Sequence, residues 1–111
     1  MKIFLSHNMS DLTKEEVMKI REEAIKTIQY YYGSDIDIID NYNHTNVPEN
    51  AGRLWHLGTS ITQLDSANAI YFCEPYANSR GCEIERHIAD LYNLKVLNKE
   101  IAIIRKENKN E

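Results

Sequence analysis

This chain lacks the long apolar runs, the positive charge and the clustered ligands that mark several large classes of protein. No stretch approaches the roughly 20 apolar residues that a bilayer-spanning helix needs, and the apolar stretch at the start is too short for a signal-peptide core. The formal net charge of -4 at pH 7 provides no field that would attract nucleic acid or an acidic membrane. We therefore expect a cytoplasmic protein with neither nucleic-acid nor membrane partners.

Cysteine is scarce, and the histidines are not clustered. The two cysteines, Cys73 and Cys82, are expected to be free thiols, as in most cytosolic proteins. Their spacing matches no zinc-binding pattern, and the four histidines are scattered along the chain. The sequence thus predicts no metal site and no cofactor.

What the chain does have is enough apolar material for one core. Its 111 residues are 42% hydrophobic and show no internal repeat. We expect a single domain spanning residues 1–111, with a charged tail from about residue 105 that frays.

Short apolar runs that alternate with amphipathic segments predict the fold. Helices are predicted from residue 13 to about residue 33, over residues 53–66 and over about residues 81–93. Strands are predicted at residues 2–6, 35–40, 68–73, 95–97 and 101–104. Strands that alternate with helices pair in parallel through right-handed crossovers. The predicted fold class is therefore α/β, with a small open parallel sheet of about five strands, flavodoxin- or Rossmann-like, and helices on both faces.

Local patterns set the ends and the buried faces of two of these helices. Thr13 and Glu16 have the spacing of a capping box, and Gly33 is a suitable helix stop. The buried stripe of the first helix is predicted to be Val17, Ile20, Ala24, Ile28 and Tyr31. The buried stripe of the last predicted helix is expected at Ile84, Ile88 and Leu91.

Two loops are candidates for ligand binding, because open parallel sheets bind ligands beyond the carboxyl ends of their strands. One loop follows the first strand and the other follows the strand at residues 68–73, and each leads into a helix N-terminus with free N–H groups. The candidate ligand-binding residues in these loops are Ser6, His7, Asn8, Met9, Ser10, Tyr76, Asn78, Ser79 and Gly81. We expect the aromatic ring of Tyr76 to stack on a ligand base, and the alternative is that it only packs within the loop. The alternative is that Ser10 and Ser79 only cap helices or form turns.

A pair of carboxylates begins the last predicted helix. Glu83 and Glu85 are two residues apart, so they point to different sides of the helix and only one can face a cleft above the sheet. Glu85 lies at the edge of the inward stripe and Glu83 away from it, so Glu85 is the candidate to face the cleft. The alternative is that both are solvated surface carboxylates.

The pattern Ser-x-Gly-x-x-x-Glu, formed here by Ser79, Gly81 and Glu85, resembles the nucleoside 2-deoxyribosyltransferases and the related deoxynucleotide N-glycosidases. Residues 2–13 (KIFLSHNMSDLT) and 80–85 (RGCEIE) are also similar to an uncharacterised bacterial and phage branch of that superfamily. The resemblance covers roughly residues 2–98. It implies that Glu85 attacks the anomeric carbon of a deoxyribose and expels the base, while Ser79 and Gly81 contact the 5′ end of the sugar or its phosphate.

The chain departs from that family at two positions. Ser60 stands at the register of an aspartate that serves the leaving base, so it is a candidate ligand contact but a poor acid, and His7 is the candidate replacement for a tyrosine near the first loop. These departures leave open a second function, the capture of a nucleotide-derived small molecule without turnover, and a third, a structural protein with a vestigial pocket.

The family builds its sites from neighbouring subunits, so the resemblance also implies a homo-oligomer, a dimer or higher. Residues 30–32, three consecutive tyrosines, offer apolar surface for such an interface.

Overall fold

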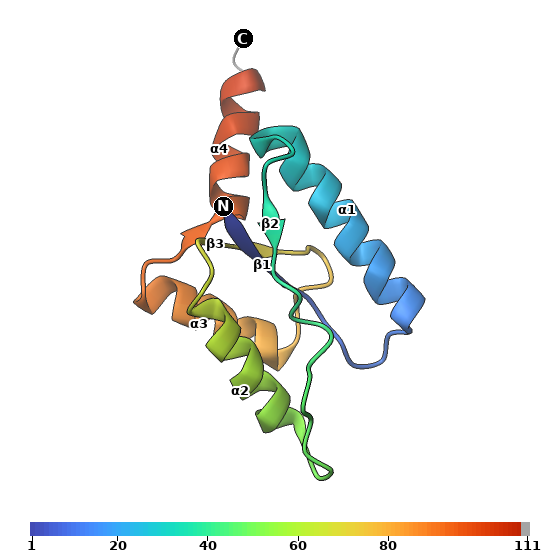
Figure 1. Ribbon diagram of the computed structural model, residues 1–111. Helices are drawn as coiled ribbons and strands as arrows, with labels where there is room; N and C mark the ends of the chain where they lie inside the picture. Colours follow the sequence, from blue (N-terminus) through green and yellow to red (C-terminus); the bar gives the residue numbers. More distant parts are fainter. Residues whose placement is uncertain (110–111) are drawn as a thin grey trace.

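Parallel strands form a sheet at the centre of the molecule, with helices on both of its faces (Figure 1). The computed structural model describes residues 1–109. Its elements in chain order are β1 (Lys2–Ser6), α1 (Lys14–Tyr32), β2 (Asp37–Ile38), α2 (Arg53–Leu64), β3 (Ala69–Phe72), α3 (Arg80–Leu91), β4 (Lys95–Val96) and α4 (Leu97–Lys109). The α/β class with an open, all-parallel sheet is therefore confirmed.

The strand order β2-β1-β3-β4 is that of a doubly wound sheet. The chain moves from β1 outward to β2, and then crosses back over β1 to pair β3 on its other side. Residues Ile3 to Ser6 of β1 pair in register with Ala69 to Phe72 of β3. The strand order thus reverses between β1 and β3, and their carboxyl ends, Ser6 and Phe72, lie next to each other.

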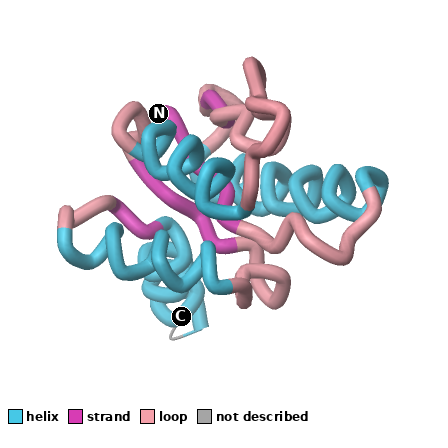
Figure 2. Tube along the Cα trace, turned by 90° about the horizontal axis from the view of Figure 1, so that it is seen from below, coloured by secondary structure: helices cyan, strands magenta, loops and turns pink. Residues whose placement is uncertain are grey.

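Alternate residues of the central strands bury two separate apolar layers. Ile3 and Leu5 pack with α1 and α4 on one face, whereas Phe4 packs with α2 and α3 on the other. In Figure 1, α1 and α4 lie above the sheet and α2 and α3 below it, and Figure 2 shows the strands at the centre with helices around them. Full burial of a side chain such as Phe4 contributes about 2 kcal/mol to stability.

The predicted ends of α1 are confirmed, and its predicted buried face is confirmed except at Tyr31, which is only partly buried. The backbone N–H of Glu16 donates to Thr13 Oγ1 at 3.1 Å, and the Thr13 N–H donates to Glu16 Oε1 at 3.2 Å, which closes the capping box. Gly33 ends the helix with a positive φ of 83°, a conformation that glycine adopts without a steric cost. The buried residues of the helix are Val17, Ile20, Arg21, Ala24 and Ile28.

The predicted fifth strand at residues 101–104 is wrong, since the described chain has four strands and this segment lies within α4. Leu97 and Ile101 are buried one helical turn apart, and Ile103 is exposed. Periodicity does not distinguish a short apolar strand from a buried turn of helix, and this segment forms helix. The tail expected to fray from residue 105 continues as helix to Lys109, and residues 110–111 lie outside the described part.

The predicted inward stripe of α3 is wrong at two of its three positions, since only Ile88 packs against the core. The buried residues of this helix are Cys82, Glu85 and Ala89, whereas Ile84 is 40% exposed and Leu91 65% exposed. The buried residues follow steps of three and four, so the true stripe is rotated from the apolar one and contains a carboxylate. An apolar pattern could not reveal this, because it assigns a charged residue to the surface.

Within residues 1–109, no helix is both long enough and apolar enough to cross a bilayer.

Candidate functional site

The two candidate loops meet where the strand order reverses. The backbone N–H of Asn8, after β1, donates to the Tyr76 carbonyl at 2.7 Å, and the Asn8 side-chain amide donates to Asn78 Oδ1. The Cys73 N–H donates to the Ser6 carbonyl at 2.9 Å, which extends the β1–β3 ladder into the loops. The two loops therefore form one continuous edge at the carboxyl ends of the central strands, the usual ligand position in such sheets.

A cleft with a volume of about 970 Å³ opens beside this edge. Its walls come from the loop after β1, the segment that precedes α2, one face of α2 and the start of α3. The residues that line it are His7, Met9, Ser10, Asn41, Tyr42, His44, Ala51, Gly52, Arg53, Leu54, His56, Leu57, Ser60, Ser79, Arg80, Gly81, Cys82, Ile84 and Glu85. A space of this size can hold a nucleotide.

Most of the residues proposed from the sequence line this cleft. They are His7, Met9, Ser10, Ser60, Ser79, Gly81 and Glu85. Ser6 is buried and contacts Glu85, while the side chains of Asn8 and Asn78 join the two loops to each other. These last three side chains support the cleft and do not line it.

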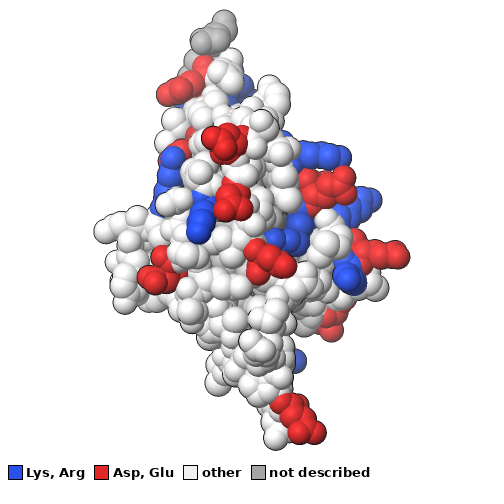
Figure 3. Space-filling model, viewed as in Figure 1, with Lys and Arg blue, Asp and Glu red and all other residues white. Residues whose placement is uncertain are grey.

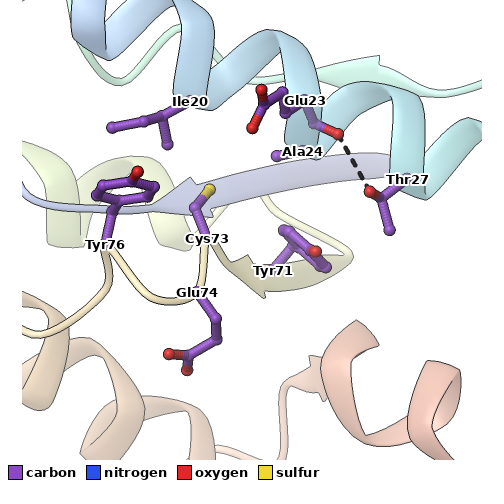
Figure 4. A pocket seen from close by; sticks show the side chains of 8 residues that line it. All are labelled: Ile20, Glu23, Ala24, Thr27, Tyr71, Cys73, Glu74 and Tyr76. Carbon is purple, nitrogen blue, oxygen red and sulfur yellow. Dashed lines mark hydrogen bonds between the residues drawn. The ribbon is translucent and has the colours of Figure 1, made fainter.

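Tyr76 lies away from the cleft. It lines a separate pocket of about 120 Å³ between the loop after β3 and α1, together with Ile20, Ala24 and Cys73. Figure 4 shows its ring facing Ile20. A stacking role for Tyr76 on a ligand in the large cleft therefore has no support from its position.

Glu85 is a buried carboxylate at the wall of the cleft. Its side chain is 6% exposed, and the Ser6 hydroxyl donates a hydrogen bond of 2.8 Å to Oε1. Burial raises the pKa of Glu85 to about 7, and the hydrogen bond from Ser6 only partly opposes this. Glu83 is exposed on another side of α3. The pair thus separates into one cleft carboxylate, poised near neutrality, and one surface carboxylate.

The start of α3 is shaped by Ser79 and Gly81. Ser79 is the N-cap, because its Oγ accepts a hydrogen bond of 3.2 Å from the Cys82 N–H. A Cβ at Gly81 would lie 3.7 Å from Leu57 Cδ1, an ordinary contact. Packing alone does not require glycine at this position, and its absent side chain leaves the first turn of α3 open to the cleft.

A buried arginine that the sequence analysis did not identify supports the part of the wall formed by His7 and Asn41. Arg21 is 8% exposed, and its Nη1 donates to His7 Nε2 at 3.0 Å and to Asn41 Oδ1 at 2.8 Å. Asn41 in turn donates to the Leu5 carbonyl at 2.8 Å. Position 21 lies four residues after Val17, on the apolar stripe of α1. An arginine on that stripe was the sequence signal from which its burial could have been predicted.

This network fixes the protonation state of His7. A guanidinium only donates, so His7 Nε2 must accept, and the ring proton sits on Nδ1, which donates to the Asn8 carbonyl at 2.9 Å. Burial lowers the pKa of His7, and the charge of Arg21 lowers it further, while the bond to the Asn8 carbonyl acts in the other direction. His7 is therefore neutral, and both of its nitrogens are occupied.

The charge balance of the cleft is positive although the chain is acidic overall. Arg53 and Arg80 line it, and neither joins an ion pair within residues 1–109. Arg21 lies directly behind His7 and Asn41 and likewise has no carboxylate partner in the described part of the chain. Figure 3 shows most charged side chains over α1 and α4, and few over α2. Uncompensated arginines favour an anionic ligand such as a phosphate.

A cluster of three aromatic rings includes two that line the cleft, those of His44 and His56. His44, from the segment before α2, and His56, on α2, have their Nδ1 atoms 2.9 Å apart, with rings nearly parallel at 17°. The Trp55 ring stands edge-on to both. Burial lowers the pKa of His44, and the neighbouring His56 lowers it further. The cluster attaches the irregular segment 41–52 to α2.

Residues 1–109 contain no group of three or more His, Cys, Asp or Glu side chains arranged to hold a metal ion. No family model matches the chain, and no curated protein or solved structure is significantly similar to it. Fold and cleft define the class on their own: a doubly wound α/β protein with a ligand-sized cleft where its strand order reverses. Within that class, the distinguishing feature is a buried glutamate in a cleft that is otherwise lined by cations and neutral groups.

Proposed function

We propose that the protein cleaves the N-glycosidic bond of a nucleoside or nucleotide, with Glu85 as the nucleophile. The observation that carries the proposal is the position of Glu85, a buried carboxylate on the wall of a cleft at the carboxyl ends of β1 and β3. Burial of a carboxylate lowers the stability of the folded protein, and buried carboxylates with a shifted pKa are concentrated at functional sites. The position of Glu85 therefore supports a role in the cleft.

The proposed reaction has two steps. An oxygen of ionised Glu85 bonds to the anomeric carbon as the carbon–nitrogen bond breaks, and the bonding pair leaves with the base, which takes up a proton. Water then attacks the resulting glycosyl ester, and Glu85 is regenerated. Attack by a second base in place of water would make the protein a transferase.

The positive balance of the cleft favours a phosphorylated substrate. Ser79 and the open first turn of α3 at Gly81 offer N–H and hydroxyl donors, and Arg80 and Arg53 add charge at the same cleft. A nucleotide would place its phosphate among these donors and its sugar against Glu85. We therefore expect nucleotides to bind more tightly than the matching nucleosides.

A second candidate function is the capture of a nucleotide-derived molecule without turnover. The burial of Glu85 favours it, because burial raises the pKa of this carboxyl group to about 7, and a carboxyl group that is half neutral at pH 7 is a weaker nucleophile. Ser60 on α2 also lines the cleft, and its neutral hydroxyl is a poorer proton donor to a leaving base than a carboxylic acid would be.

One experiment separates the two candidates. The four 2′-deoxynucleoside monophosphates and their nucleosides are incubated with the protein, and free base is measured by chromatography, with binding measured by calorimetry. Base release that is lost in Glu85→Gln and retained in Glu83→Gln, the matched surface variant on the same helix, supports the enzyme. Binding with full recovery of intact ligand supports capture. Release that persists in Glu85→Gln contradicts the role of Glu85, and absence of both binding and release contradicts both candidates.

A further inference from the structure

Departure of a nucleobase needs a proton donor, and the cleft offers few. Proton transfer to a leaving group by a positioned acid contributes about 10²–10⁴-fold to the rate of such reactions. The donor must face the same cleft as Glu85 and must exchange a proton near neutrality. Ser60 lines the cleft but is a neutral hydroxyl.

The other groups that line the cleft are excluded one by one. The arginines do not release protons at working pH. His7 has both ring nitrogens occupied, by Arg21 and by the Asn8 carbonyl. Cys82 is 1% exposed, and its sulfur accepts a hydrogen bond of 3.1 Å from Ser79. The remaining lining hydroxyls, including the phenol of Tyr42, give up a proton near pH 7 less readily than an imidazole does. Among the described lining residues, the imidazoles of His44 and His56 are therefore the best candidates for the proton donor.

The pairing of the two imidazoles distinguishes their roles. A contact of 2.9 Å between the two Nδ1 atoms needs one nitrogen to donate and the other to accept. Burial and the neighbouring His56 lower the pKa of His44, so His44 is the member of the pair that stays neutral and accepts the hydrogen bond. His44 is half-buried, and its Nε2 is enclosed without a hydrogen-bond partner in the described chain, whereas His56 is exposed to the cleft.

We propose that His56 is the acid that protonates the departing base, with His44 as the positioning residue that accepts a hydrogen bond from its Nδ1–H. The inference rests on the proposed function. As the carbon–nitrogen bond breaks and its electron pair moves onto the base, the Nε2 proton of His56 passes to the base. His56 is left neutral with its bond to His44 intact, and water restores the proton in the next cycle.

The placement of His56 on α2 supports this role. It precedes Ser60 by four residues, so the two side chains lie one turn apart on the face of α2 that lines the cleft. Asp40, at the start of the adjoining segment, is the charged group that acts on His44, and the other charged or titratable groups of the same cleft include Tyr42, Arg53, Arg80 and Glu85. Asp40 raises the pKa of His44, but burial and His56 outweigh it.

The test compares two leaving groups. One substrate set is the 2′-deoxynucleoside monophosphates, and the other is 4-nitrophenyl 2-deoxyriboside 5-phosphate, whose phenolate departs without protonation. We expect His56→Gln to lower kcat on the nucleotide by about 10²-fold or more and on the aryl glycoside by less than about 10-fold. His44→Gln is expected to lower the nucleotide rate to a smaller extent and to spare the aryl glycoside. His87→Gln, an exposed histidine on α3 outside the cleft lining, is the matched control and should change neither rate.

The outcomes also separate this inference from the proposed function. Equal loss on both substrates in His56→Gln indicates a packing role and overturns the inference, as does no loss on either. In both cases Glu85→Gln would still abolish turnover of the two substrates, so the proposed function would stand. Absence of turnover of both substrates by the unaltered protein would overturn the proposed function and the role of His56 with it.

Discussion

The buried carboxylate makes a stability prediction that needs no ligand. Replacing Glu85 with Gln keeps the size of the side chain and keeps an oxygen that can accept the hydrogen bond from Ser6, at 2.8 Å in the native protein. The substitution removes only the ability to ionise. Any pH-dependent difference in stability between the two proteins therefore reports on the Glu85 carboxyl group.

The size of the difference follows from the pKa. Burial raises the pKa of Glu85 from 4.5 to about 7, and each pH unit between these values corresponds to about 1.4 kcal/mol. Below pH 4.5 the group is protonated in both states and costs nothing. Between pH 4.5 and 7 the unfolded chain releases the proton first, so the native protein loses stability as the pH rises, by about 3 kcal/mol in total. Above pH 7 the loss is constant.

The assay is urea unfolding, followed by far-ultraviolet circular dichroism at several pH values from 5 to 8.5. Glu85→Gln is expected to match the native protein within about 1 kcal/mol at pH 5 and to exceed its stability by about 3 kcal/mol at pH 8.5. Glu83→Gln, on the exposed side of α3, is the control and is expected to stay within about 0.5 kcal/mol throughout. A difference between Glu85→Gln and the native protein that does not change with pH would refute the assigned burial and pKa.

Three further predictions concern other parts of the molecule. Asn41→Ala leaves a buried guanidinium N–H of Arg21 and the Leu5 carbonyl without partners, so urea unfolding is expected to show a loss of about 2–4 kcal/mol, and a loss below about 0.5 kcal/mol would contradict the network. Nitrogen-15 NMR is expected to find His7 as the neutral Nδ1–H tautomer at pH 6, and a doubly protonated ring would contradict its contact with Arg21. Sedimentation velocity is expected to show a homo-oligomer, and a pure monomer at micromolar concentration would remove that proposal.

Much of the fold was predictable because its signals are local. The capping box at Thr13, the glycine at 33 and the stripe of α1 act within a few residues. The structure confirms the two helix ends and every position of the predicted stripe except Tyr31. The segment at residues 101–104 was not predictable in the same way. Its apolar run suits a strand and a helical turn equally well, and the choice depends on the space that β3 and β4 leave for α4.

The candidate site likewise contains residues that local sequence patterns could identify and residues that only the tertiary fold brings together. Glu85 could be nominated from its register on a helix that follows a strand, although the buried stripe around it was misplaced. Arg21, Asn41 and His56 come from three separate segments, and their proximity to the cleft arises only from the crossover of the chain at the strand-order reversal. Hydrogen bonds between residues 14 to 20 positions apart leave no periodic trace in a sequence.

Substitutions on the two sides of the cleft are expected to differ in their effect on the stability of the fold. Ser6, Arg21 and Asn41 are buried and bonded to the central strand or to groups that contact it, so a change on that side costs folding and chemistry together. The other side consists of residues 42–52, without helix or strand, and the exposed first turn of α2. Exchanging side chains such as Tyr42 and Leu54 there would leave the core intact. Variants of this protein with new ligand preferences are therefore most readily obtained on that side, with the reacting carboxylate left in place.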